Sequence, residues 1–264
     1  MSLYLGSTKV GSLYLGSSKI GTAYLGSAKV YSSGDPYNPL NLPPYTLRLK
    51  FQYGKTPAFR SGSSGVQVSS NPNVWDWTYN NAVWSGGFYG NTTTRGYLLE
   101  VLGGNTTGVT DMFQLFMSCS GLTTVAVFDT SSVTTTGAMF YGTAITTAPL
   151  YDLSSATTTS SMFSGCSSLT SVPLYNTGSV TNMARMFQGC SRLQTIPLFD
   201  TSSATDMSSM FLSCNYVTSG SLALYQQASS QATPPTSHSQ CFYNCGSSTT
   251  TGSRELAQIP SDWK

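Results

Sequence analysis

The clearest pattern along the chain is an apolar motif that recurs every 23 or 24 residues. Each copy carries a phenylalanine, and four of the five copies carry a cysteine three residues later. A period of this length is typical of a solenoid, in which each coil buries its apolar side chains only against its neighbours. The residues expected to form this internal ladder are Phe116, Phe140, Phe163, Phe187, Phe211, Cys119, Cys166, Cys190 and Cys214.

Within each repeat, the spacing of apolar residues predicts a short helix. In residues 182–190, four apolar side chains fall on one helical stripe, and the preceding Thr181 is a suitable N-cap, as is Thr205 one repeat later. The stripe consists of Met183, Met186, Phe187 and Cys190. We therefore expect a β-rich α/β solenoid in which each coil of about 24 residues contains one short strand and one short helix.

The strand predicted for each coil has an alternating pattern that suggests a binding surface. In residues 171–175, alternation would place Val172 and Leu174 inside and Pro173 and Tyr175 outside. Stacked coils would then expose a row of aromatic side chains suited to carbohydrate or protein, unless the rings tuck beneath the neighbouring turn as a second core. The predicted binding surface consists of Phe128, Tyr151, Tyr175, Phe199 and Tyr225, with Pro173 and Pro197 beside them.

Residues 45–107 have a period of two in place of the repeat of 23 or 24 residues, and we predict that they form a small β-rich domain that caps the array. Apolar and polar residues alternate strictly over residues 45–53, as in a half-buried strand. Trp75, Trp77 and Tyr79 also share one face of a predicted strand. Aromatic rows of this kind can stack on sugars, but in a domain of this size a core position is the more frequent role.

The N-terminal 31 residues repeat a decapeptide three times, each copy containing two short strand-like pieces around a Gly-Ser turn. Strands this short need a neighbour to bury their apolar surface. The neighbour is either the rest of the chain, in a β-meander, or another protein; we favour an attachment and oligomerisation segment. The aligned residues assigned to this role are Tyr4, Tyr14, Tyr24, Lys9, Lys19 and Lys29.

These patterns divide the chain into five segments. A Gly- and Pro-rich stretch links the decapeptides to the β-rich domain, and the tail after the last full repeat echoes the motif once more at Cys241 and Cys245. The predicted segments are 1–31 (attachment), 32–44 (linker), 45–107 (β-rich domain), 108–225 (solenoid) and 226–264 (C-terminal cap).

Composition excludes several functions. Charged residues make up 8% of the chain and the net charge is +2, whereas nucleic-acid binding requires clustered Lys and Arg. No apolar run is long enough for a membrane span, so membrane insertion is not expected. The N-terminus has no basic leader followed by an apolar stretch, so we expect no secretory signal.

The reactive side chains do not form a catalytic or metal-binding motif. Four of the six cysteines share one repeat position, which favours buried thiols over disulfides. His238 is the only histidine, so neither a zinc site nor a Ser-His-Asp nucleophile is expected, and we predict no catalytic residue, metal or cofactor. The acidic column Asp129, Asp152, Asn176 and Asp200 fits turn formation better than calcium binding.

The segment "VTNMARMFQGCSRLQTIPLFDTSSATDMSSMF" resembles the BspA-type leucine-rich repeats of the DUF285 family, also described as a surface-protein 26-residue repeat. The resemblance covers about residues 109–225 and implies a solenoid, with adhesion or interaction rather than catalysis as its function. Family members occur on bacterial surfaces and in phage genomes, and the "YLGSTKV" units resemble those that head phage structural proteins. The chain departs from the family pattern at Thr143, which replaces the cysteine, and one residue is missing nearby.

From these observations we expect a non-enzymatic bacteriophage virion protein, a fibre or a capsid or tail decoration subunit, located on the virion surface. Residues 1–31 would bind other virion proteins and support a homo-oligomer, for example a trimer. The solenoid would bind a protein or glycan of the host surface. The alternative is a BspA-like adhesin on a bacterial cell surface that binds a host protein or glycan.

Overall fold

Each N-terminal decapeptide forms a two-stranded antiparallel hairpin. The computed structural model describes residues 40–59, 61–68, 71–87 and 92–264, together with the backbone of six short strands between residues 4 and 32. These strands are β1 (Tyr4–Leu5), β2 (Thr8–Lys9), β3 (Leu13–Leu15), β4 (Ser18–Ile20), β5 (Thr22–Leu25) and β6 (Ala28–Ser32). The register sets a tyrosine opposite a lysine in every hairpin, Tyr4 with Lys9, Tyr14 with Lys19 and Tyr24 with Lys29. The side chains of these tyrosines and lysines, and residues 33–39 of the predicted linker, lie outside the described residues.

A five-stranded sheet follows, in the order β11-β10-β7-β9-β8. Its strands are β7 (Thr46–Phe51), β8 (Ser63–Gln67), β9 (Val74–Tyr79), β10 (Leu98–Asn105) and β11 (Thr124–Val125), and helix α1 (Thr92–Tyr97) precedes β10. All neighbouring strands are antiparallel except β10 and β11, which are parallel. Since β11 belongs to the first full coil of the repeat array, the sheet passes directly into the solenoid.

The alternation predicted for β7 is present in its buried side chains. Leu47, Leu49 and Phe51 are at most 1% exposed, whereas Arg48 on the opposite face forms an ion pair of 2.7 Å with Asp76 of β9. Tyr53, the last apolar residue of the alternating run over residues 45–53, is 80% exposed because β7 ends at Phe51. The buried face of the sheet is therefore three residues long on this strand.

The aromatic row of β9 lies mainly in the core, as its residue types favour. Trp77 is 1% exposed and packs edge-on against Tyr79 and at a tilt against Trp84, with ring centroids 5.2 and 5.7 Å apart. Trp75 is only partly buried and lies against Phe59. One hydrophobic cluster runs from Leu47 in the sheet to Trp263 at the C-terminus, so sheet and solenoid share a single core.

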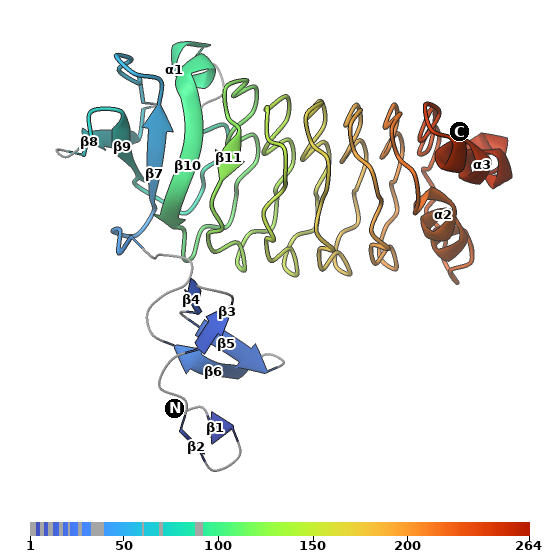
Figure 1. Cartoon of the computed structure of the whole chain (residues 1–264), viewed down its shortest axis with the longest axis horizontal. Coiled ribbons are helices and arrows are strands. Elements are labelled where there is room, and N and C mark those ends of the chain that lie inside the picture. Colours follow the sequence, from blue (N-terminus) through green and yellow to red (C-terminus); the bar gives the residue numbers. More distant parts are fainter. Residues whose placement is uncertain are drawn as a thin grey trace.

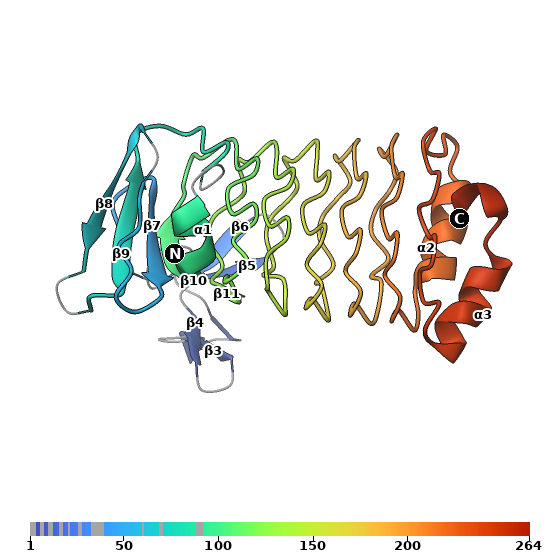
Figure 2. The same ribbon diagram turned by 90° about the horizontal axis from the view of Figure 1, so that it is seen from above.

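Stacked coils form the rest of the molecule and extend along its longest axis (Figures 1 and 2). Parallel backbone bridges join one residue of each coil to the equivalent residue of the next, and they connect Val83, Asp111, Thr135, Thr158, Asn182, Asp206 and Ser237 in order. The stack therefore begins before residue 108 and continues beyond residue 225. Both predicted boundaries of the solenoid fall inside the observed stack.

The predicted helix in each coil is wrong. No helix forms in residues 98–220, all of which the structure describes. Residues 183–190 instead make successive β-turns, with backbone hydrogen bonds from Met186 to Met183, from Gln188 to Arg185 and from Cys190 to Phe187. Thr181 does not cap a helix either, because its Oγ1 donates to the carbonyl of Thr157 in the preceding coil at 3.2 Å.

The turns are favoured because they direct every second N–H group at the neighbouring coil. The N–H groups of Met183, Arg185, Phe187 and Gly189 donate to the carbonyls of Asp206, Ser208, Met210 and Leu212, at 2.8–2.9 Å. A helix would use these donors within its own coil. Left-handed backbone at Arg185 and Gly189, with φ of 57° and 71°, keeps the segment extended enough to stack. The predicted strand is also shorter than expected: it has two residues in β11 of the first full coil and a single bridged residue in later coils, such as Thr195 opposite Ser219.

The phenylalanine column forms a continuous aromatic stack inside the coils. Phe116, Phe140, Phe163, Phe187 and Phe211 are each 0% exposed, and successive ring centroids lie 5.3–5.6 Å apart at angles of 5–19°. Phe242 extends the stack by one ring, 5.8 Å from Phe211. Because each ring covers the faces of its two neighbours, the stack needs the same side chain in every coil.

The C-terminal segment closes the stack. Helix α2 (Ser221–Ser229) takes the place of the segment that begins at Pro197 in the preceding coil, since the bridge between Thr195 and Ser219 aligns the two coils. A last coil follows at about residues 237–249, and α3 (Thr250–Gln258) and the short 3-10 helix η1 (Ser261–Trp263) complete the chain. Trp263 stacks on Phe242 with centroids 6.2 Å apart, and its carbonyl accepts the N–H of Phe242 at 2.9 Å. The last ring and the last coil are thus covered by the chain's own tail.

We predict that Phe187→Ala lowers the free energy of unfolding by about 3–5 kcal/mol, because it opens a ring-sized cavity in a dry core. Urea denaturation of the full chain measures the change. Leu198→Ala is the matched control, since Leu198 is 54% exposed, and its effect should stay within about 0.5 kcal/mol. Equal losses in the two variants would show that the register of the coils is wrong.

Candidate binding surface

The aromatic row predicted to face outward is buried, so that prediction is wrong. Phe128 and Phe199 are 0% exposed, and Tyr151 and Tyr175 are 2% exposed. Tyr225 is half-buried in α2, edge-on to Trp263 at 5.4 Å. The alternative, a second core beneath the neighbouring turn, is the one that the structure has.

These aromatic side chains pack beside the phenylalanine stack. Phe199 lies parallel to Phe187 with centroids 5.7 Å apart, and Tyr175 lies parallel to Phe163 at 6.2 Å. The hydroxyl of Tyr175 donates to the carbonyl of Pro149 at 3.0 Å, which satisfies its only donor inside the core. Burial raises the pKa of Tyr175 well above its ordinary value. The aromatic side chain at this repeat position is therefore part of the packed core in four consecutive coils.

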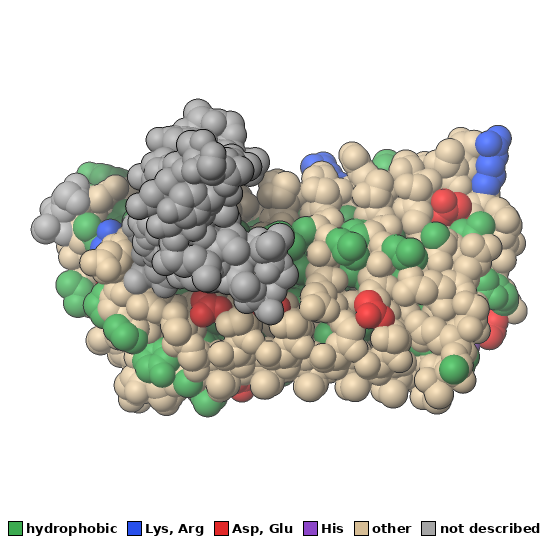
Figure 3. Space-filling model, turned by 90° about the horizontal axis from the view of Figure 1, so that it is seen from below, with side chains coloured by type: hydrophobic (Ala, Val, Ile, Leu, Met, Phe, Trp, Pro, Cys, Tyr) green, Lys and Arg blue, Asp and Glu red, His purple; other side chains and the backbone are tan. Residues whose placement is uncertain are grey.

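The residue just before each aromatic side chain is the one that faces solvent. Leu150 and Leu174 are each 60% exposed, Leu198 is 54% exposed and Val127 is 39% exposed. These four residues, here called the aliphatic row, occupy one position in four consecutive coils. Pro173 and Pro197 precede two of them and are half-buried. The lower face of the molecule shows hydrophobic side chains spaced along the solenoid (Figure 3).

The acidic column next to the aliphatic row forms turns, as its position suggests. The Oδ1 atoms of Asp129, Asp152 and Asp200 accept the N–H groups two residues later, at 2.9–3.0 Å. Hydrogen bonds from Ser202 lower the pKa of Asp200. A second column with the same geometry, Asp111, Asn182 and Asp206, lies at the bridge position. The side chains of both columns shape the backbone.

The cysteine column is a row of buried thiols. All six cysteines are free and 0% exposed. The thiols of Cys190 and Cys214 donate to the carbonyls of Phe163 and Phe187 in the preceding coils, each at 3.1 Å. Burial raises the pKa of Cys119 to about 12 and that of Cys166 to about 11. These thiols are consequently protonated and inert at neutral pH.

Thr143 replaces the cysteine with little disturbance. Its hydroxyl donates to the carbonyl of Phe140 at 3.0 Å and lies 3.3 Å from the sulfur of Cys166. The ring of Phe140 still stacks on that of Phe163 at an angle of 6°. The missing residue falls in the turn between Thr143 and Ile145, outside the ring stack, so the coil keeps its register.

Exposed threonines form a regular hydroxyl ladder along one face. Each Oγ1 donates to the backbone carbonyl of the equivalent threonine in the preceding coil at 3.1–3.3 Å. The ladder consists of Thr110, Thr134, Thr157, Thr181 and Thr205. Because the hydrogens of these four donating hydroxyls are used in bonds between coils, the surface presents methyl groups and oxygen lone pairs in a fixed array.

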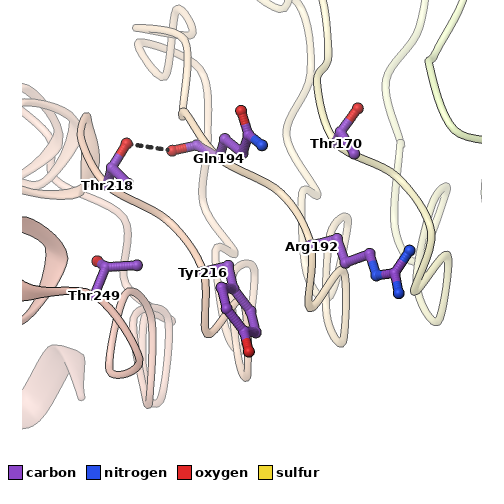
Figure 4. A pocket seen from close by; sticks show the side chains of 6 residues that line it. All are labelled: Thr170, Arg192, Gln194, Tyr216, Thr218 and Thr249. Carbon is purple, nitrogen blue, oxygen red and sulfur yellow. Dashed lines mark hydrogen bonds between the residues drawn. The ribbon is translucent and has the colours of Figure 1, made fainter.

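A hollow of about 480 Å³ lies over the last coils, where three successive turns meet the start of α3. Figure 4 shows its lining side chains on adjacent coils. They are Thr170, Arg192, Gln194, Tyr216, Thr218 and Thr249. The hollow combines an exposed aromatic ring, a guanidinium group, an amide and three hydroxyl groups.

Other chemistry is sparse in the described part of the chain. Among those residues, no three His, Cys, Asp or Glu side chains lie close enough together to hold a metal ion. His238 stacks on Trp263 with centroids 4.2 Å apart. No helix in the described residues combines the length and the hydrophobicity needed to cross a bilayer.

The fold and its surfaces define a solenoid repeat protein with an inward-facing aromatic stack. A family model described as "Mycoplasma protein of unknown function, DUF285" matches residues 88–195, 110–222 and 146–249. Together these overlapping matches span more than half of the 264-residue chain, so the protein belongs to the DUF285 family. No curated protein and no solved structure matches the chain.

Sequence reasoning identified neither the aliphatic row nor the hollow. The dipeptide "PL", which precedes the aromatic residue in three coils, carried the signal for the row, but the strand alternation was assigned one residue out of phase. The sequence signal for the hollow was a change of residue size at one repeat position. Arg192 and Tyr216 stand at a position where the first three coils have only Gly121, Ala144 and Ser168.

We expect no thiol of the folded chain to react with Ellman's reagent at pH 8, because all six are buried and those of Cys119 and Cys166 ionise only near pH 11–12. The colour change on adding the reagent measures reactive thiols, and unfolding in guanidinium without a reductant should release all six. Rapid reaction of the native protein would contradict the burial, and fewer than six thiols after unfolding would reveal disulfides.

Proposed function

We propose that this DUF285 protein is a non-enzymatic adhesion protein whose solenoid binds a protein or glycan of a cell surface. The observation that carries the proposal is the aliphatic row, four apolar side chains that are 39–60% exposed in four consecutive coils. Stacking does not require an apolar residue at a position whose side chain points to solvent. Large exposed apolar patches on soluble proteins commonly mark interaction sites.

The cysteine and aspartate side chains of the coils form structural hydrogen bonds, which supports adhesion over catalysis. The thiols lie behind the turns and donate to backbone carbonyls, and burial raises the pKa of Cys190 and Cys214 further. The aspartates of the turn columns accept backbone N–H groups. What remains outward is a weakly charged surface of hydroxyl, amide and aliphatic groups, repeated at the spacing of the coils.

The N-terminal hairpins supply the attachment segment in this proposal. Three copies of one hairpin, each with tyrosine opposite lysine, would present the same contact three times to a partner. We assign residues 1–31 to binding other proteins of a virion, as part of a fibre or a capsid or tail decoration, with the chain as a homo-oligomer such as a trimer. The solenoid would then project from the virion surface towards the host cell.

The second candidate is a BspA-like adhesin on a bacterial cell surface that binds a host protein or glycan. The family description favours it, since it refers to a bacterial genus, Mycoplasma. The two candidates use the same solenoid surface but differ in the cells that it contacts. A virion protein would bind bacterial cells, and a bacterial adhesin would bind the cells of the host organism.

We predict that the fluorescently labelled full chain binds intact cells of one of two panels, bacterial strains or animal epithelial cells, as measured by flow cytometry. The triple variant Leu150→Ser, Leu174→Ser, Leu198→Ser should lose at least about tenfold in affinity, because buried apolar contact provides the binding energy. Its thermal unfolding should stay unchanged, since these side chains are 54–60% exposed.

The matched control is the variant Thr134→Ser, Thr157→Ser, Thr181→Ser, which alters three exposed residues of the hydroxyl ladder and keeps their hydroxyl groups. This control should bind as the unaltered chain does. Equal binding by the leucine variant, or binding to no cell of either panel, would contradict the proposal.

A further inference from the structure

One position in the repeat changes from small to large side chains in two consecutive coils. It immediately precedes the buried aliphatic residue of each coil, and it is occupied in order by Gly121, Ala144, Ser168, Arg192 and Tyr216. Arg192 and Tyr216 are exposed, Tyr216 by 56%. Stacking is satisfied by a small residue here in three coils, so the two large side chains are not required by the fold.

A neighbouring column departs from its repeat in the same place. The position two residues further on is threonine in four coils, at Thr123, Thr146, Thr170 and Thr218, and glutamine at Gln194. Arg192, Gln194 and Tyr216 therefore differ from the repeat together, and all three line the hollow of about 480 Å³ (Figure 4). A volume in this range is typical of small-molecule sites.

The hydroxyl groups of Thr170 and Thr218 in the hollow are fixed as acceptors. The Oγ1 of Thr218 donates to the carbonyl of Gln194 at 2.9 Å, and that of Thr170 donates to the carbonyl of Thr146 at 3.0 Å. Since each hydroxyl has one hydrogen, only lone pairs remain for a ligand. The donors available to a ligand are the guanidinium of Arg192, the amide of Gln194 and the phenol of Tyr216. Acceptors and donors thus lie side by side on a rigid frame.

The hollow carries an uncompensated positive charge. Arg185 and Arg192 are the only basic residues in positions 108–220 of the sequence. Within the described residues, Arg192 forms no ion pair, and no carboxylate is among the residues that line the hollow. A guanidinium that is free of protein partners can form two parallel hydrogen bonds with one carboxylate.

We propose that this hollow binds a sugar residue that carries a carboxylate. The aromatic face of Tyr216 would stack on the apolar face of the sugar ring, and Arg192 would bind its carboxylate. Gln194 and the oxygens of Thr170 and Thr218 would bond to the sugar hydroxyls. The proposal rests on the proposed function, adhesion, and names the class of glycan and the coils that recognise it.

Three probes test the full chain in calorimetric titrations and saturation-transfer NMR: sialyllactose, a hyaluronan tetrasaccharide and lactose. Sialyllactose and hyaluronan carry the carboxylate on a sialic acid and on a uronic acid, and lactose is the neutral counterpart of sialyllactose. At least one acidic probe should bind about ten times more tightly than lactose. Which acidic probe binds identifies the type of sugar acid. Binding of neither acidic probe, or equal binding of acidic and neutral probes, would overturn the proposal.

Variants locate the site. Arg192→Gln should reduce the affinity for the acidic probe about tenfold and remove its advantage over lactose. Tyr216→Ala should abolish the saturation-transfer signal of the sugar ring. Arg185→Gln, which removes the same charge from an exposed arginine elsewhere on the array, is the matched control and should bind the acidic probe unchanged. Unchanged binding by Arg192→Gln, or an equal loss in Arg185→Gln, would refute the site.

Cell binding separates this inference from the proposed function. A chain that binds cells as well after Arg192→Gln and Tyr216→Ala, and binds no acidic probe, is an adhesion protein without this site. A chain that binds an acidic probe through Arg192 and Tyr216 but binds no cell has the site without the proposed function.

Discussion

The hydrogen bonds between coils are the constraint on which the rest of the structure depends. Every second N–H group of the turn segment donates to the next coil, as Phe187 does to Met210 at 2.9 Å. These bonds fix the distance between equivalent residues and hold their side chains in register. A ring must then lie on a ring and a thiol behind a turn, which is why the same residue types return in every coil. The tail ends this pattern by placing Trp263 over the last ring.

The sequence predicted the period, the phenylalanine stack and the buried thiols because these features follow from repetition alone. A column of identical apolar residues at a fixed spacing is buried most readily between stacked repeats. It did not predict the local backbone. Met183, Met186 and Phe187 have helical spacing, yet the same residues are buried by a chain of turns with left-handed backbone at Arg185 and Gly189. Side-chain spacing cannot distinguish the two, since the choice depends on whether the N–H groups bond within the coil or between coils.

Side-chain spacing also failed to predict which residues of the candidate surfaces face solvent. In residues 171–175, simple alternation placed Tyr175 outside, but only one residue of the segment is bridged, at Ser171, and the residues after it form no strand. The period of two therefore fails after that residue, and Leu174 faces solvent instead. The hollow was accessible to sequence reasoning in principle. Exposed positions that differ from an otherwise regular column, such as Arg192 and Gln194, are free of the stacking constraint and so are the positions that function can alter.

Scalar couplings across hydrogen bonds test the stacking of the coils most directly. In the full chain, labelled with nitrogen-15, carbon-13 and deuterium, NMR detects which carbonyl carbon accepts the N–H group of each residue. The structure predicts a coupling between the nitrogen of Phe187 and the carbonyl carbon of Met210, in the next coil. A coupling from Phe187 to the carbonyl of Met183 instead, as in an α-helix, would contradict it.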